Sequence, residues 1–162
     1  EIKECDWSSD VCSSDLGELV AVEDMPTLRD GTKGRPTVNS ALLAAVVREW
    51  NPSAAYLEFV AARPGEGPTG AFAFGRSRGV VEGVLAASGV SIEFLTPQTW
   101  KRLIGIPPGK DGAKDAARAE AIRRWPTKAG MFARVKDDGR AEAALIAVAG
   151  KGRNDRSKEQ KR

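Results

Sequence analysis

From residue 17 onward, two hydrophobic periodicities alternate along the chain. Short apolar runs rich in strand-forming residues predict strands at 18–24, 54–62 and 91–95. Between and after these runs, apolar residues recur at helical spacing. This spacing predicts helices at 40–50, 71–87, 97–103, 113–125 and 138–150. Strands that alternate with helices in this way predict an α/β domain with a mostly parallel central sheet.

Glycine, proline and charged residues interrupt the pattern at 27–37, 63–70 and 106–112, where we expect loops. The last twelve residues, 151–162, contain six basic and two acidic residues. We expect them to form a basic, disordered tail.

Residues 1–16 do not share the pattern of the rest of the chain. They contain both cysteines, five acidic residues and one basic residue, and they show neither helical nor strand periodicity. Two cysteines without another cysteine or a histidine cannot close a zinc site. The stretch CDWSSDVCSSDL resembles the translation of a common sequencing-library adapter. We therefore expect residues 1–16 to be an assembly artefact that replaces the native N-terminus.

The composition limits the kinds of catalytic and metal-binding sites that the chain can form. A chain of 162 residues suits one domain, and it has no apolar run near the roughly 20 residues of a membrane helix. It contains no histidine, which excludes Ser-His-Asp and Cys-His catalysis and histidine-ligated zinc. Any metal would be bound by carboxylates and backbone oxygens, the ligands that magnesium and manganese prefer.

The charge is unevenly distributed. The formal net charge is +3, but residues 1–16 carry −4 and residues 17–162 carry +7. An excess of that sign suggests a polyanionic partner, although a basic tail by itself is more often only a solvated surface.

Glu58 lies in the middle of the apolar run AAYLEFVAA, where burial of an unpaired carboxylate would be costly. In a strand, Tyr56, Glu58 and Val60 share one face. Either this face is half exposed and Glu58 lies in water, or Glu58 belongs to a functional site.

A second acid has a similar setting. Glu142 lies within the apolar sequence RAEAALIAVAG, and Asp138 precedes it by one helical turn on the same face. Like charges at that spacing destabilise a helix unless a cation lies between them. The attraction of acids to a helix N-terminus explains Asp137 and Asp138 well, but it explains Glu142 poorly. If strand and helix carboxylates converge, they could bind one or two magnesium ions for phosphodiester hydrolysis.

The helix expected at 71–87 contains Gly75, Gly79 and Gly83 at four-residue spacing. Each glycine costs about 1 kcal/mol relative to alanine, so we expect this bare stripe to pack closely against the sheet or a partner subunit. The alternative is that the bare stripe allows a nucleic-acid backbone to approach the helix closely. Arg76 and Arg78 flank the stripe and could reach phosphates, or could simply be solvated.

Together these segments resemble RuvC-type Holliday-junction resolvases, in particular the phage and prophage branch, within the RNase H-like superfamily. The resemblance extends from Val20 to Gly150. It rests on four stretches in the family's order: VAVEDMPT (20–27), YLEFVAARPGEGPTGAFAFGRSRGVVEGVLAASG (56–89), TPQTWKRLIGIPPGKDGAKDAARAEAIRRWP (96–126) and KDDGRAEAALIAVAG (136–150).

The resemblance implies an RNase H-like α/β domain over residues 17–150, with a mixed central sheet flanked by helices. It also implies a cytoplasmic endonuclease of a bacterial or phage-infected cell, with no membrane partner. Such an enzyme binds branched DNA, the four-way junction, as a homodimer. It hydrolyses phosphodiesters with two magnesium or manganese ions per active site.

The family's metal ligands and catalytic acids fall on Glu58, Asp138 and Glu142, with Asp137 as an alternative because the spacing of the last two acids varies. Lys101, in the sequence TPQTWK, falls on a basic catalytic residue near the scissile phosphate.

A second basic residue of the family matches Lys114 in KDAAR, and Lys110 is its rival because the chain has two extra residues there. Lys114, the better match, would contact DNA together with Lys101, Arg76 and Arg78. Phe72 and Phe74 match the region that approaches the junction, where a ring could stack on an unpaired base. Core packing explains these two phenylalanines equally well.

One family feature is missing. The family's first strand is apolar and ends in Asp-x-Gly, whose aspartate bridges both metals. Here Asp15 is followed by Leu16 and Gly17, but no apolar strand precedes it and residues 18–24 follow too closely for a hairpin. We therefore expect a missing or disrupted first strand, an exposed sheet edge that favours aggregation, and a chain that is inactive or nearly so.

Two functions from different classes remain. The first is a structure-selective DNA endonuclease, and the second is a non-catalytic module that binds branched DNA through its basic surface. A nucleotide-binding domain is not supported, because the sequence has no Walker-type loop and no G-x-G-x-x-G after a strand.

Overall fold

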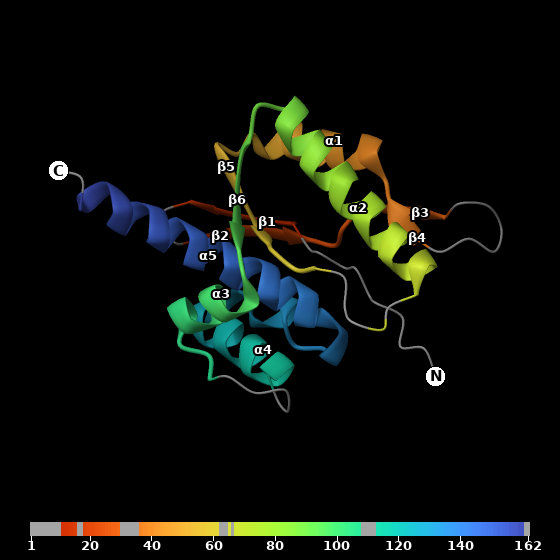
Figure 1. Ribbon diagram of the computed structural model, residues 1–162. Helices are drawn as coiled ribbons and strands as arrows, with labels where there is room; N and C mark the ends of the chain where they lie inside the picture. Colours follow the sequence, from red (N-terminus) through yellow and green to blue (C-terminus); the bar gives the residue numbers. More distant parts are fainter. Residues whose placement is uncertain are drawn as a thin grey trace. The chain divides into compact units, whose positions relative to one another are not determined.

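The structure, a computed structural model, describes residues 11–15, 18–29, 36–61, 65, 67–107 and 113–160 (Figure 1). These residues form a mixed α/β protein with small sheets. The chain divides into two compact units. Residues 26–97 form the middle unit, and residues 1–25 together with 98–162 form the terminal unit.

The middle unit is built around a β-α-β crossover. Its elements are β3 (Thr27–Arg29), β4 (Pro36–Val38), α1 (Ser40–Trp50), β5 (Ala54–Glu58), α2 (Pro68–Ala87) and β6 (Ser91–Leu95). Strands β5 and β6 run parallel, in register from Ala54 opposite Ser91 to Glu58 opposite Leu95. Because parallel neighbours cannot be joined by a tight turn, the long helix α2 connects them.

Local sequence explains where the helices of this unit begin and end. The Asn39 side chain accepts a hydrogen bond from the Leu42 backbone N–H at 3.2 Å and so caps α1. The helix stops at Asn51, which has a left-handed φ of 43°. Helix α2 starts with Pro68 in its first turn, where a missing N–H costs nothing. Leu43, which is buried in α1, belongs to the core of this unit.

The terminal unit combines an antiparallel strand pair with helices. Its elements are β1 (Val11–Asp15), β2 (Glu18–Glu23), α3 (Pro97–Ile104, whose first residue closes the middle unit), α4 (Ala113–Arg124), the 3-10 helices η1 (Pro126–Met131) and η2 (Val135–Asp137), and α5 (Asp138–Glu159). Helix α5 packs against α4, β1 and β2. The fully buried side chains include Trp100, Phe132 and Leu145.

Small residues and one lysine hold this unit together. Ala117 and Ala121 of α4 and Ala141 of α5 are completely buried, which suits two helices that pack closely. Lys128 of η1 donates hydrogen bonds to the backbone carbonyls of Leu19 and Val20 in β2, the second at 2.7 Å. The ammonium group therefore covers polar backbone atoms of the strand.

The structure corrects the predicted sheet. The described strands pair as three two-stranded sheets, β1 with β2, β3 with β4 and β5 with β6, and only the last pair is parallel. Part of the loop expected at 27–37 forms the antiparallel pair β3 and β4. Single-sequence periodicity missed these strands because each is only three residues long.

The two ends of the chain also differ from the prediction. Residues 11–15, expected to lack regular structure, form β1 and make an antiparallel hairpin with β2, in which Asp15 lies opposite Glu18. Residues 151–159, expected to be disordered, continue α5. The expectation that no hairpin fits before residues 18–24 was therefore wrong. Within the described part of the chain, no helix is both long and apolar enough to cross a membrane.

Candidate functional site

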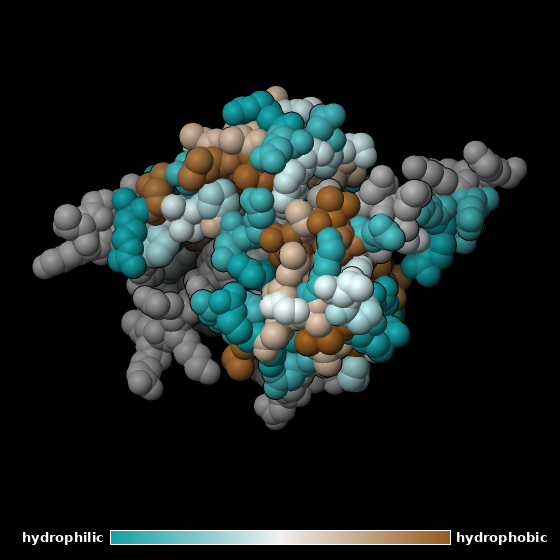
Figure 2. Space-filling view, turned by 180° about the vertical axis from the view of Figure 1, so that it is seen from behind, coloured by the Kyte–Doolittle hydropathy of each residue, from teal (hydrophilic) through white to brown (hydrophobic). Residues whose placement is uncertain are grey.

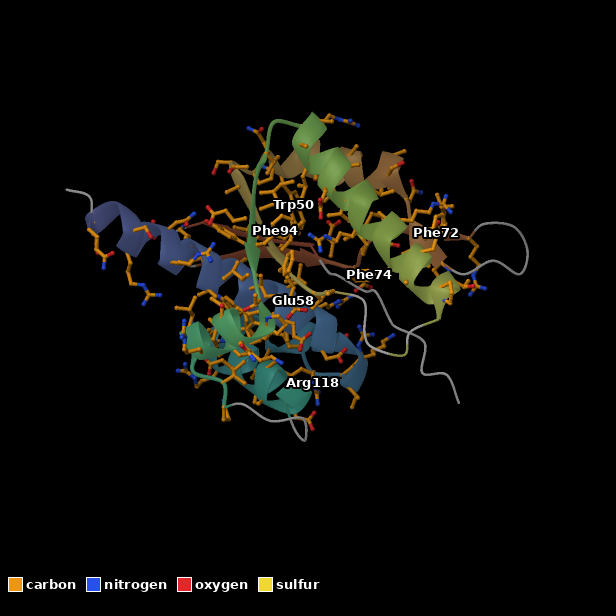
Figure 3. All side chains as sticks on the ribbon, viewed as in Figure 1. Trp50, Glu58, Phe72, Phe74, Phe94 and Arg118 are labelled. Atoms are coloured by element: carbon orange, nitrogen blue, oxygen red, sulfur yellow. The ribbon has the colours of Figure 1, made fainter. Side chains whose placement is uncertain are left out.

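Glu58 ends strand β5 and lies opposite Leu95 of β6. Phe59 donates its backbone N–H to the Leu95 carbonyl oxygen at 2.8 Å, so the pairing continues just past the acid. The Glu58 residue is half-buried. The structure thus places this carboxylate at the carboxyl end of a parallel strand pair, the edge where α/β proteins commonly place functional groups (Figure 3).

A clamp formed by Arg78 holds the backbone beside Glu58. The Arg78 guanidinium lies 5.0 Å from the ring centre of Phe59 and 4.9 Å from that of Phe94, and the two rings meet edge to face. Its Nε donates to Glu82 Oε1 at 2.5 Å, one turn along α2. A terminal nitrogen donates to the Val60 carbonyl oxygen at 3.3 Å. One guanidinium thereby connects α2 to the ends of both strands.

The clamp gives Arg78 a structural role. The sequence predicted that Arg78 contacts DNA phosphates, but its cationic group is directed at aromatic rings, a carboxylate and a carbonyl of the middle unit. Each cation–π contact contributes about 0.5–1 kcal/mol at such partly exposed positions. Arg78 therefore fixes the chain that follows Glu58.

The first turns of α2 present an aromatic residue and a cation to solvent. Phe72 is 73% exposed, so core packing does not explain it. Arg76, one turn later on the same side of the helix, is also exposed. Phe74 is half-buried (Figure 3). An exposed ring beside an arginine is an arrangement that can stack on a base while holding a phosphate.

The glycine stripe faces open space. A Cβ placed on Gly75, Gly79 or Gly83 would meet no described atom within 4 Å, so close packing of the stripe against the described strands is wrong. Packing against a partner subunit stays a prediction. Gly79 and Gly83 instead line a groove of about 600 Å³ beside α1, which Val47 and Arg48 line on the other side.

Asp138 and Glu142 lie at the start of α5, one turn apart, and both are half-buried. The Asp138 side chain accepts a hydrogen bond from the Gly139 backbone N–H at 3.0 Å. The structure therefore confirms that these two acids share a helix face at its N-terminal end, where the helix dipole favours negative charge.

Asp137 has a different environment from its neighbour. Only 2% of it is exposed, and Arg134 donates to its carboxylate through the backbone N–H at 2.9 Å and through the guanidinium at 2.8 Å. The hydrogen bonds from Arg134 lower the pKa of Asp137 below its usual value. Because both oxygens accept hydrogen bonds from this arginine, Asp137 is a capping residue, which argues against it as a metal ligand.

Arg140 extends this ionic network to Asp24, the residue that follows β2. Its Nε donates to Asp24 Oδ1 at 2.6 Å, and a terminal nitrogen lies 4.0 Å from Asp137 Oδ1. The hydrogen bond from Arg140 lowers the pKa of Asp24. Neither Arg134 nor Arg140 was predicted as a partner of Asp137, although their positions three residues before and after this acid could have indicated them.

The predicted lysines have different settings. Lys101 lies in α3, with its Nζ 5.2 Å from the ring centre of the fully buried Trp100. Lys114 lies in the first turn of α4, and Lys110 falls outside the described residues. In the helix that carries Lys114, Arg118 pairs with Asp115 and donates to the Ala133 carbonyl oxygen at 3.2 Å.

Magnesium in proteins binds oxygen ligands, carboxylates among them. Glu58 of the middle unit and Asp138 and Glu142 of the terminal unit offer carboxylate oxygens, which is the right chemistry. However, the described residues contain no group of three or more histidine, cysteine, aspartate or glutamate side chains that could hold a metal ion. The structure brings Asp138 and Glu142 together on one helix of the terminal unit, and it places Glu58 at the end of a strand of the middle unit.

Comparison of the chain with family models and with curated proteins found no match.

Proposed function

We propose that this chain is a structure-selective DNA endonuclease of the Holliday-junction resolvase type. The observation that supports it most is the placement of three acids: Glu58 ends β5, Asp138 begins α5, and Glu142 follows one turn later. These are the acids that the resemblance to RuvC-type resolvases implies as metal ligands. The net charge of +7 over residues 17–162 suits a DNA substrate.

Each group has a distinct part in the proposed reaction. The three carboxylates would hold two magnesium or manganese ions, which when bound activate water and stabilise the leaving oxygen. Lys101 would lie near the scissile phosphate. Phe72 would stack on an unpaired base and Arg76 would bind the backbone. The resemblance further implies a homodimer.

We also propose that the chain in its present sequence cleaves poorly. Strand β1 has the sequence VCSSD, where the family has an apolar strand ahead of its aspartate. The first-strand carboxylate of the family would therefore be poorly supported here.

The test measures cleavage of a four-way junction by the original chain and by a variant in which β1 is strengthened. The variant Ser13→Val/Ser14→Ile strengthens β1 and retains Asp15, so magnesium-dependent cleavage should rise above that of the original chain. Adding Glu58→Gln should lower this cleavage by about 100-fold or more, while binding to the junction in EDTA stays unchanged. Glu49→Gln, an exposed acid of α1, removes the same charge and should leave cleavage intact. Cleavage that survives Glu58→Gln would contradict the proposal.

A second candidate is a non-catalytic module that binds branched DNA. The observation that favours it is the polar strand β1, VCSSD, which stands where the family has an apolar strand that ends in its metal-bridging aspartate. This function predicts junction binding with no cleavage in either background, at any magnesium or manganese concentration.

A further inference from the structure

Helix α5 is packed in the core along its middle, whereas the two acids of the proposed metal site lie near its start. Its buried apolar residues run from Ala141 to Ala149. From Asp155 onward the described side chains are exposed, and Figure 2 shows hydrophilic residues, drawn in teal, at that end. The first turn of a helix lacks part of its hydrogen bonding and frays easily. The direction of the Asp138 and Glu142 side chains therefore depends on what holds this turn.

Arg140 ties the first turn of α5 to the chain that follows β2. Its Nε donates to Asp24 Oδ1 at 2.6 Å, across 116 positions of the sequence. Strand β2 is itself held, because Lys128 donates to the backbone carbonyls of Leu19 and Val20. The Asp24 side chain is 69% exposed, and an ion pair with such an exposed acid contributes little to stability. We therefore look for the role of this contact in geometry.

Arg140 lies on the opposite side of the helix from the two acids. With about 100° of rotation per residue, Asp138 and Glu142 share one side of α5, and Arg140 is two residues from each. A contact on the far side sets the rotation of the helix about its axis, and this rotation decides where both carboxylates point. Metal ligands need to be held to within about 0.5 Å of their working geometry. The Arg140 contact is well placed to do this.

Two other arginines fix the chain that leads into α5. Arg134 holds Asp137 in the turn directly before the helix. Arg118 of α4 donates to the Ala133 carbonyl oxygen at 3.2 Å. Both contacts act before the helix begins, whereas Arg140 acts within its first turn. The rotation of that turn is thus set by Arg140 more directly than by the other two arginines.

We propose that Arg140, held by Asp24, is a positioning residue that directs Asp138 and Glu142 toward a divalent metal ion. This inference rests on the proposed function, because that function makes the two acids metal ligands. Removal of a group that orients metal ligands typically costs about 10–100-fold in metal affinity. The charge of Arg140 by itself acts in the opposite direction, since a cation near the carboxylates repels the metal.

The experiment measures the affinity of the full chain for Mn²⁺ alone, by isothermal titration calorimetry at about 150 mM salt. Arg140→Gln should weaken Mn²⁺ binding by about tenfold. If Arg140 acted only through its charge, the same variant would bind Mn²⁺ more tightly. The direction of the change therefore separates positioning from simple electrostatics.

Variants of the partner acid test the contact itself. Asp24→Asn breaks it from the exposed side and should weaken Mn²⁺ binding about as much as Arg140→Gln. The double variant Arg140→Gln/Asp24→Asn keeps the original net charge and should bind no more weakly than either single variant, because all three lose the same contact. Charge effects alone would return the double variant to the original affinity. If Arg140→Gln does not fold, Asp24→Asn at about 1 M salt decides, because salt screens the charge effect.

Two further variants serve as controls. Arg140→Lys keeps the charge and a donor that can reach Asp24, so its Mn²⁺ affinity should recover to within about threefold of that of the original chain. Arg123→Gln removes the same charge from the exposed pair with Glu120 in α4 and should leave Mn²⁺ affinity unchanged. Circular dichroism and thermal unfolding of each variant check that the fold is kept.

The outcomes separate this inference from the proposed function. Mn²⁺ binding that is lost in Glu142→Gln, but unchanged or tighter in Arg140→Gln, overturns the inference alone. Absence of Mn²⁺ binding by the original chain, or binding that survives Asp138→Asn/Glu142→Gln, overturns the metal site of the proposed function and this inference with it. Weaker Mn²⁺ binding in Arg140→Gln, in a chain that never cleaves a junction, supports the inference and overturns the endonuclease.

Discussion

Asp137 and Asp138 are adjacent in the sequence, but their surroundings give them different chemistry. Asp137 is buried and accepts hydrogen bonds from Arg134, whereas Asp138 is half-buried at the first turn of α5. A carboxylate that is fully engaged by an arginine keeps its charge and its position, but it has little capacity left for a metal. At the residue scale, burial therefore selects Asp138 as the better candidate ligand.

The lowered pKa of Asp137 leads to a prediction about acid stability. A carboxyl whose pKa is lower in the folded state stabilises the fold above the unfolded pKa of about 3.9, and this contribution disappears as the pH falls through the folded pKa. Asp137→Asn should therefore lose about 2 kcal/mol of unfolding free energy at pH 7 and should show a weaker dependence of stability on pH below about pH 5.

Urea denaturation of both proteins at neutral and acidic pH measures this difference. Asp155→Asn, a substitution of an exposed acid in α5, serves as the control and should change stability by no more than about 0.5 kcal/mol. Equal acid sensitivity in the original protein and in Asp137→Asn would show that the Arg134 contact does not stabilise the fold.

At the scale of elements, β1 changes the interpretation of the first sixteen residues. Although the sequence of residues 11–15 is polar and does not alternate, this segment pairs with β2 and packs against α5. Strand formation here follows from its partners, because β2 offers free backbone groups and α5 offers a surface to cover. Whether the adapter-like sequence is native and whether β1 stabilises the fold are therefore two separate questions.

Two deletions test whether β1 contributes to the stability of the fold. Removal of residues 1–16 takes away β1, exposes the edge of β2 and should lower the melting temperature by roughly 10 °C, with increased aggregation. Removal of residues 1–10 leaves β1 in place and should have little effect. Thermal unfolding and light scattering of both proteins give the answer. If the two deletions behave alike, β1 contributes nothing to the fold.

At the scale of the whole molecule, the distribution of charge can be calculated directly from the sequence. Residues 1–16 carry −4 and residues 17–162 carry +7, so the cationic excess belongs to the part of the chain on which the proposed function rests. Long-range attraction of this kind acts on any polyanion, whereas selection of a branched structure needs groups such as Phe72 that meet unpaired bases.

We therefore expect the protein to bind a four-way junction at least tenfold more tightly than a linear duplex of the same length. Affinity for both should fall by at least about tenfold between about 50 and 200 mM salt. Phe72→Ala should reduce the preference for the junction and leave the salt dependence unchanged. Competition binding with the two DNAs measures the preference. An affinity that does not respond to salt would argue against phosphate contacts.

The sequence and the tertiary structure determine different features of this protein. The sequence by itself determined the main helices, the strands around 18–24 and 91–95, the position of Glu58 in a strand and the shared helix face of Asp138 and Glu142, because hydrophobic periodicity is a local signal. The role of these acids as metal ligands stays a prediction. Only the tertiary structure decided how the strands pair, that Arg78 holds the chain after Glu58, and that Arg134 engages Asp137. It also decided that residues 151–159 are helical. These features depend on groups far apart in the sequence or on packing, and hydrophobic pattern carries no information about either.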